Sequence, residues 1–257
     1  VRIFDRTNKQ VTPTSVGEKI ILQAKKTLIE FEKIAELVAE EKNQITQSLS
    51  LSVGPSIAPY ILPDFIKHYR KDYPKVSLSI QEMKSKEMFN LLQNGDIDVG
   101  IAVSDQLRKG ILEIPLYTEC FYVYLSETCW RKLPVFKPEN LEHENMWIMK
   151  EAQCLRDSAF SFCKARSKGQ HIYEAGSIDT LIRIVDNNGG FTIIPELHLA
   201  FLSEAQRKNV RKIEGDYLSQ RRISLYIRED CIKERMLNTI VDCMKEFMPS
   251  QMMNEGI

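Results

Sequence analysis

Apolar residues near the start of the chain recur with the spacing of a helical heptad. They follow a 3-4-3-4 pattern through Ile21, Ala24, Leu28, Phe31, Ala35 and Val38. Such a seam favours packing against a second helix, and a helix of roughly 45 Å would extend beyond a small lobe. We therefore expect residues 13–44 to form a linker helix that dimerises. Packing of the seam against its own domain is the alternative.

The residues before this helix predict how it begins. Residues 1–12 alternate between apolar and polar around the sequence TNKQ, which indicates a short hairpin. Thr12 is expected to cap the helix and Pro13 to occupy its first turn. Ser15 and Glu18 have the spacing of a capping box.

Beyond residue 44 the pattern changes to short strands alternating with amphipathic helices. The first series predicts strands at 48–53, 76–81 and 97–103. The last of these strands follows a predicted helix, which ends at Gly95. This order favours a parallel, doubly wound sheet, in which ligands bind at the carboxyl ends of the strands. The loops that carry Ser56 and Ser85 should therefore face a pocket, where the two hydroxyls either bind a small ligand or cap the following helices.

A second series of the same kind starts at residue 119. It predicts strands at 119–125, 146–149, 171–175, 191–195 and 221–227, and helices over 153–163, 177–190 and 232–248. We expect two α/β lobes, with the last strand and helix returning to the first. The expected boundaries are 45–118 with 221–257 for the first lobe and 119–220 for the second.

Composition is that of an ordinary globular chain. The net charge of zero argues against polyanion binding by the chain as a whole. No apolar run approaches the ~20 residues of a membrane span, and the polar, basic first residues do not resemble a signal peptide, so we expect a cytoplasmic protein. Hydrolase and transferase motifs such as GxSxG, HExxH and the P-loop do not occur.

Two of the six cysteines stand apart from the others. In a helix over 153–163, Cys154 would lie in the first turn near Arg156, where positive charge stabilises a thiolate. Cys163 lies beside Phe162 and looks sheltered. Nine helical residues separate their Cα atoms by roughly 13 Å, whereas a disulfide tolerates ~7 Å, so a bond between them requires the helix to unwind. Two unrelated buried thiols are the alternative.

The remaining cysteines lack such a basic setting and are expected to be packing residues. They are Cys120, Cys129, Cys231 and Cys243. No CxxC occurs and only four histidines are present, so the spacing of a zinc site is absent.

Several segments resemble LysR-type transcriptional regulators. FDRTNKQVTPTSVGEKI resembles the end of their winged helix-turn-helix and the start of their linker helix. SLSLSVGPSIAPYILPDFI, LLQNGDIDVGIAV and NNGGFTIIP resemble their regulatory domain. CLRDSAFSFC resembles the peroxide-sensing element of the members that respond to hydrogen peroxide.

The resemblance implies a two-lobed, periplasmic-binding-protein-like α/β domain after a linker helix, with residues 1–12 as a remnant of the wing. It implies a dimer or tetramer, DNA binding through a head that this chain largely lacks, and RNA polymerase as a partner. It implies neither a cofactor nor a metal. Oxidation would switch transcription of antioxidant genes.

Carried over residue by residue, the resemblance makes Cys154 the peroxidatic cysteine and Cys163 the resolving one, with Arg156 beside the sensing thiol. Gln153 departs from the family, because well-known members have histidine there.

Ser56 and Ser85 match threonines of the peroxide pocket and keep the hydroxyl. Two other functions stay open: a LysR-type regulator that senses a small organic effector in the interlobe cleft, and a thiol peroxidase.

Overall fold

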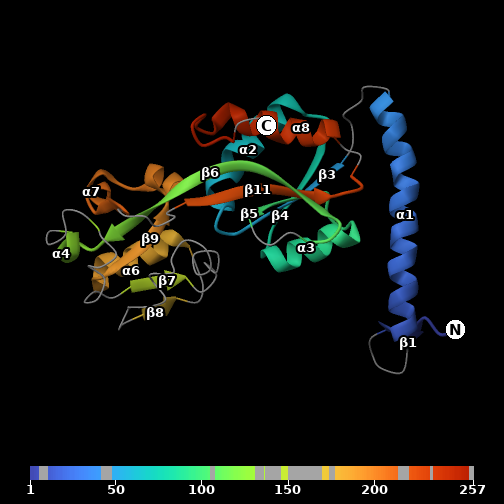
Figure 1. Cartoon of the computed structure of the whole chain (residues 1–257), viewed down its shortest axis with the longest axis horizontal. Coiled ribbons are helices and arrows are strands. Elements are labelled where there is room, and N and C mark those ends of the chain that lie inside the picture. Colours follow the sequence, from blue (N-terminus) through green and yellow to red (C-terminus); the bar gives the residue numbers. More distant parts are fainter. Residues whose placement is uncertain are drawn as a thin grey trace. The chain divides into compact units, whose positions relative to one another are not determined.

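The computed structural model describes residues 1–5, 11–41, 48–104, 108–130, 136, 146–149, 170–173, 177–213, 220–231 and 234–254 (Figure 1). The chain divides into two compact units. The first unit holds 1–102, 106–114 and 225–249, and the second holds 103–105, 115–224 and 250–257. The lobe boundaries expected from the sequence stay a prediction. The helix expected over 153–163 lies outside the described residues.

The chain begins with a hairpin, as predicted. Strands β1 (Phe4–Asp5) and β2 (Thr12–Pro13) pair antiparallel, with Phe4 opposite Pro13. The predicted cap at Thr12 and helical start at Pro13 are wrong, because both residues belong to β2. Thr14 takes the capping position: its backbone amide donates to the Ile3 carbonyl at 2.9 Å, and its Oγ1 accepts from the Gly17 amide at 3.0 Å.

Helix α1 (Ser15–Glu41) follows this hairpin directly. Gly17 is buried at the junction, where a Cβ would overlap the carbonyl oxygen of Ile3. A glycine is therefore what allows the first turn of α1 to approach the hairpin so closely. Among the described residues, no helix is long and apolar enough to cross a membrane.

The first unit contains a parallel sheet of the predicted strands. Its order is β4 (Ser77–Glu82), β3 (Ser48–Val53), β5 (Val99–Val103). The next strand in the order is β11 (Gln220–Arg228), whose residues divide between the two units. Val53 at the end of β3 lies opposite both Glu82 of β4 and Ile101 of β5, and both pairings are parallel. Leu49, Leu51 and Val53 are buried on one face of β3, which explains the alternation in SLSLSV.

Beside α1, the described residues of the first unit form three helices. They are α2 (Ala58–Asp72), α3 (Ser85–Asn94) and α8 (Glu234–Phe247). Gly95 ends α3 in the left-handed conformation (φ 74°), as its position predicted. Helices α2 and α8 pack together, and the hydroxyls of Tyr69 and Thr239 hydrogen-bond between them at 2.9 Å.

The sheet of the second unit is mixed, unlike the parallel sheet predicted for the first series of strands. β6 (Ile111–Leu125) pairs antiparallel with β9 (Phe191–Pro195) and β10 (Val210–Lys212). β7 (Met146–Met149) pairs parallel with β8 (Gln170–Tyr173) and β9. Alternation of apolar residues marks a strand but not its direction, which the connections set.

Four helical segments lie in the part of the second unit that the structure describes. They are α4 (Glu127–Trp130), α6 (Ile178–Asn188), the 3-10 helix η3 (Glu196–Phe201) and α7 (Glu204–Arg207). Ser177 caps α6 by accepting from the Thr180 amide at 3.3 Å, and Ser203 forms a capping box with Gln206 at the start of α7.

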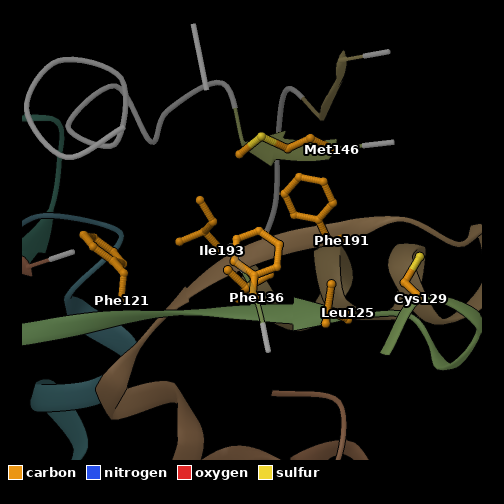
Figure 2. Packing of buried hydrophobic residues seen from close by; sticks show 8 residues of the cluster. Phe121, Leu125, Cys129, Phe136, Met146, Phe191 and Ile193 are labelled. Atoms are coloured by element: carbon orange, nitrogen blue, oxygen red, sulfur yellow. The ribbon is translucent and has the colours of Figure 1, made fainter. Parts of the chain in front are cut away.

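Side chains of β6 divide between the two faces of this sheet. On one face, Phe121, Val123 and Leu125 belong to a buried cluster completed by Cys129, Phe136, Met146, Phe191 and Ile193 (Figure 2). On the other face, Tyr124 packs in a second cluster with Ile182, Val185, Ile194 and Leu202. The strand is therefore covered on both sides, and this fixes its register.

Candidate functional site

Ser56 and Ser85 follow neighbouring strands of the first unit. Ser56 lies in the turn after β3, and Ser85 is the first residue of α3, after β4; both are half-buried. The two strands end together, since Val53 pairs with Glu82 and the Met83 amide donates to the Val53 carbonyl at 3.1 Å. Both serines therefore leave the sheet at its carboxyl edge, where doubly wound sheets bind ligands.

The capping alternative for these serines is wrong. The capping positions of α2 and α3 are occupied by Ile57 and Lys84 instead, and neither of these side chains forms a capping hydrogen bond. Ser85 lies inside the first turn of α3, and within the described part of the chain its hydroxyl has no hydrogen-bond partner. Its hydroxyl is thus able to bind a ligand at a helix N-terminus, where the first amides also lack intrahelical acceptors.

Two of the four described cysteines are packing residues, as predicted. Cys129 is 3% exposed within the second-unit cluster, and Cys243 is 2% exposed on α8. Burial raises the pKa of the Cys243 thiol to about 12, and the nearby carboxylates of Glu246 and Asp72 add to this. Cys243 is accordingly a neutral thiol at physiological pH.

Cys120 and Cys231 are half-buried rather than fully packed. The Cys120 sulfur accepts a hydrogen bond from Gln220 Nε2 at 3.6 Å. Burial is the largest cause that raises the pKa of Cys120, and the Glu196 carboxylate adds to it, although Lys212 acts in the opposite direction. A raised pKa leaves little thiolate, which is the reactive form.

The four residues expected in the redox element lie outside the described residues. They are Gln153, Cys154, Arg156 and Cys163. Their roles stay predictions that rest on the sequence.

The seam predicted on the linker helix is exposed in the isolated chain. Leu28, Phe31 and Val38 are 61%, 72% and 50% exposed. Ala24 is also exposed and Ile21 is half-buried, whereas the surroundings of Ala35 are not described. The alternative that the seam packs against its own domain is therefore wrong for Leu28, Phe31 and Val38.

Two features of the second unit escaped the sequence analysis. One is a buried ion pair between Glu119 and Arg221, 2.7 Å apart, and the other is a hollow beside η3 and β10. A charged residue at an inward strand position, as in ECFYVYL, is the signal that could have revealed the pair. No such signal marks the hollow, since its walls come from short elements far apart in the sequence.

Comparison with known proteins places these observations in a family. Residues 42–249 match the LysR substrate binding domain. The HTH-type transcriptional regulator EstR of Acinetobacter baylyi is 26% identical over 244 residues, which cover 94% of this chain and 80% of that protein. The hydrogen peroxide-inducible genes activator of Haemophilus influenzae is 26% identical over 213 residues, covering 82% and 70%.

A solved structure agrees with these relatives. The crystal structure of OxyR from Porphyromonas gingivalis superposes with a TM-score of 0.74 at 27% identity, covering 81% of this chain and 96% of that one. The expected two-lobed, periplasmic-binding-protein-like α/β fold is thereby confirmed. Because the family match spans most of its length, this chain belongs to the LysR substrate-binding domain family.

Proposed function

We propose that this chain is the linker and regulatory region of a hydrogen-peroxide-sensing transcriptional activator of the OxyR type. One observation carries the proposal: the sequence CLRDSAFSFC occurs in a chain similar to a peroxide-inducible activator and to OxyR structures. The family match alone does not specify what is sensed, so the proposal of a peroxide function depends on the cysteine pair.

The chemistry requires two thiols and one peroxide. The Cys154 thiolate attacks one peroxide oxygen, the O–O bond breaks, and hydroxide leaves and takes up a proton to form water. The resulting sulfenic acid is attacked by the Cys163 thiol, which forms the disulfide and releases a second water. Two electrons pass from the two sulfurs to the peroxide, so no further reductant is needed. Arg156 and the start of the helix would stabilise the thiolate.

The described residues support the assignment in two ways. The raised pKa values of Cys120 and Cys243 make both thiols poor nucleophiles for peroxide. Ser56 and Ser85 place two hydroxyls at the carboxyl edge of the first-unit sheet, and both can donate and accept hydrogen bonds. Gln153 offers an amide in place of an imidazole, and an amide can still hydrogen-bond a peroxide.

A disulfide across this element is strong enough to act as a switch. Closing a loop of about ten residues contributes roughly 3 kcal/mol in the chain-entropy model, which is comparable to typical allosteric coupling. Remodelling of 153–163 would then alter a dimer or tetramer built in part on the exposed seam of α1. We propose that the head preceding this helix binds DNA in the cytoplasm and that the oxidised form recruits RNA polymerase.

Transcription in response to peroxide tests the function. A reporter driven by the intact regulator should respond to peroxide, and Cys154→Ser should abolish the response. Cys129→Ser is the matched control, because that thiol is buried in the second-unit core, and it should leave the response in place. If Cys154→Ser responds normally, the redox function is wrong.

A regulator that senses a small organic effector is the second candidate, because EstR, whose name does not mention peroxide, is as similar to this chain as the peroxide-inducible activator is. Such a regulator would keep its response when both Cys154 and Cys163 are replaced by serine. A thiol peroxidase would instead consume peroxide continuously in the presence of a thiol reductant. The sensor proposed here reacts once and then waits for slow reduction, so steady-state peroxide consumption separates the two.

A further inference from the structure

A hollow of about 450 Å³ lies on the second unit. It is lined by Tyr122, Leu199, Ala200, Arg207, Val210 and Lys212. All six residues belong to the second unit. Sites for small organic ligands commonly enclose ~300–1,000 Å³, so the size suits a small molecule.

We call this hollow the η3–β10 pocket, and the paired strands β6 and β10 form one of its walls. Lys212 of β10 lies opposite Tyr122 of β6 in an antiparallel pair, and directly opposed side chains share a face of the sheet. Leu199 comes from η3, and Val210 lies two residues before Lys212 on the same face of β10.

The floor of the pocket is apolar. Tyr122, Leu199 and Val210 pack against the buried cluster that contains Tyr124 and Leu202. An apolar floor continuous with a core gives a ligand a fixed surface, and burying apolar area on that surface stabilises a complex.

Two cations stand at the rim. Arg207 donates from Nε to the Leu202 carbonyl at 3.3 Å, which leaves its other guanidinium nitrogens for a ligand. The Lys212 ammonium lies near β6, close enough for its positive charge to lower the pKa of Cys120. Within the described part of the chain, neither cation forms an ion pair. The neighbouring carboxylate, Glu196, accepts the Cys120 amide at 3.0 Å.

We propose that the η3–β10 pocket binds a small amphipathic carboxylate, with its anionic head between Arg207 and Lys212. The apolar body of the ligand would cover Leu199, Val210 and the ring of Tyr122. Fully polar anions such as phosphate would leave this floor unused. The pocket would thus give the second unit a ligand site that does not depend on the cysteines.

Binding of octanoate to the whole chain tests the site, by calorimetry or by chemical-shift titration. Octanoate should bind saturably, and added salt should weaken it. Octanol, which keeps the chain but loses the charge, should bind more weakly. Lys212→Met should weaken octanoate roughly two- to fivefold, as expected for one solvent-exposed charge pair.

Two further variants separate the pocket from a general basic surface. Ala200→Trp places an indole in the hollow and should abolish octanoate binding. Lys208→Met removes an exposed cation of the same segment that does not line the pocket, and it should leave binding unchanged. The proposal is overturned if octanoate does not saturate, if octanol or phosphate binds as tightly, or if Lys208→Met weakens binding as much as Lys212→Met.

Discussion

The carboxylate of Glu119 accepts two hydrogen bonds from the guanidinium of Arg221 inside the second unit. Nε and one terminal nitrogen of Arg221 lie 2.8 and 2.7 Å from the same oxygen of Glu119. The other oxygen accepts the Leu197 amide at 3.3 Å. Because both side chains are buried, either charge without its partner would be costly.

Glu119→Gln should therefore lower the free energy of unfolding by about 3–5 kcal/mol, because it leaves the Arg221 charge buried and uncompensated. The double variant Glu119→Leu with Arg221→Met should recover most of this loss, since it removes both charges. Urea denaturation measures each value.

The exposed pair between Lys25 and Asp96, 2.9 Å apart, provides the control. Lys25→Ala should change the free energy of unfolding by less than about 1 kcal/mol. Equal effects of Glu119→Gln and Lys25→Ala would contradict the importance of the buried pair.

Gly100 on β5 lies against Met88 of α3 in the first unit. A Cβ at Gly100 would stand 2.5 Å from the Met88 sulfur, and Met88 is fully buried. Gly100→Ala should overpack this contact and lower the free energy of unfolding by about 1–3 kcal/mol.

Gly54→Ala is the matched substitution, because a Cβ there meets its nearest side-chain atom at an ordinary 3.6 Å. Thermal unfolding of the two variants should place Gly100→Ala clearly lower. A lower melting temperature for Gly54→Ala would show that the Met88 contact does not limit this position.

His198 makes the second unit sensitive to acid. Burial lowers the pKa of this imidazole, and the Asp179 carboxylate, 4.0 Å from Nε2, partly opposes that effect. The folded state therefore holds a proton on His198 less tightly than the unfolded state does. The contribution of neutral His198 to stability is fully present above its unfolded pKa of about 6.5. This contribution is lost as pH falls from there through the lower folded pKa.

His198→Asn removes this titration. The free energy of unfolding of the original chain should fall relative to that of the variant between about pH 7.5 and about pH 5.5. Urea denaturation at both pH values gives the difference, and a constant difference would exclude the role of His198.

The exposed seam of α1 predicts self-association. Phe31 is 72% exposed, and burying its ring in a helix–helix contact is the expected use of an apolar seam. Phe31→Glu should shift the chain toward the monomer in analytical ultracentrifugation. Lys26→Glu, five residues earlier and on another side of the helix, should leave the mass unchanged. If both variants associate like the original chain, the seam is not the interface.

Local patterns predicted much of the fold. The strands at 48–53 and 191–195 and the end of α3 at Gly95 were all identified, because burial on alternate positions and a left-handed glycine leave clear signals. β6 begins at Ile111 rather than 119, because its first half lacks a regular alternation. The short η3, α7 and β10 carry too few residues to show any period.

The positions of the candidate site residues could be predicted from the sequence only where the order of the strands determines them. Ser56 and Ser85 were found because parallel strands end at one edge of a sheet. The η3–β10 pocket and the Glu119–Arg221 pair depend on contacts between distant segments, which no spacing in the sequence reveals. The cysteine pair was identified by its resemblance to a peroxide-sensing element.

Mass spectrometry of the intact chain, digested before and after one equivalent of hydrogen peroxide, tests the central claim most directly. Before oxidation, Cys154 and Cys163 should both be free thiols. Afterwards their peptides should be joined by a disulfide, while Cys129 and Cys243 stay reduced because both are buried. A Cys154 and Cys163 pair that stays unmodified while peroxide is present would contradict the account.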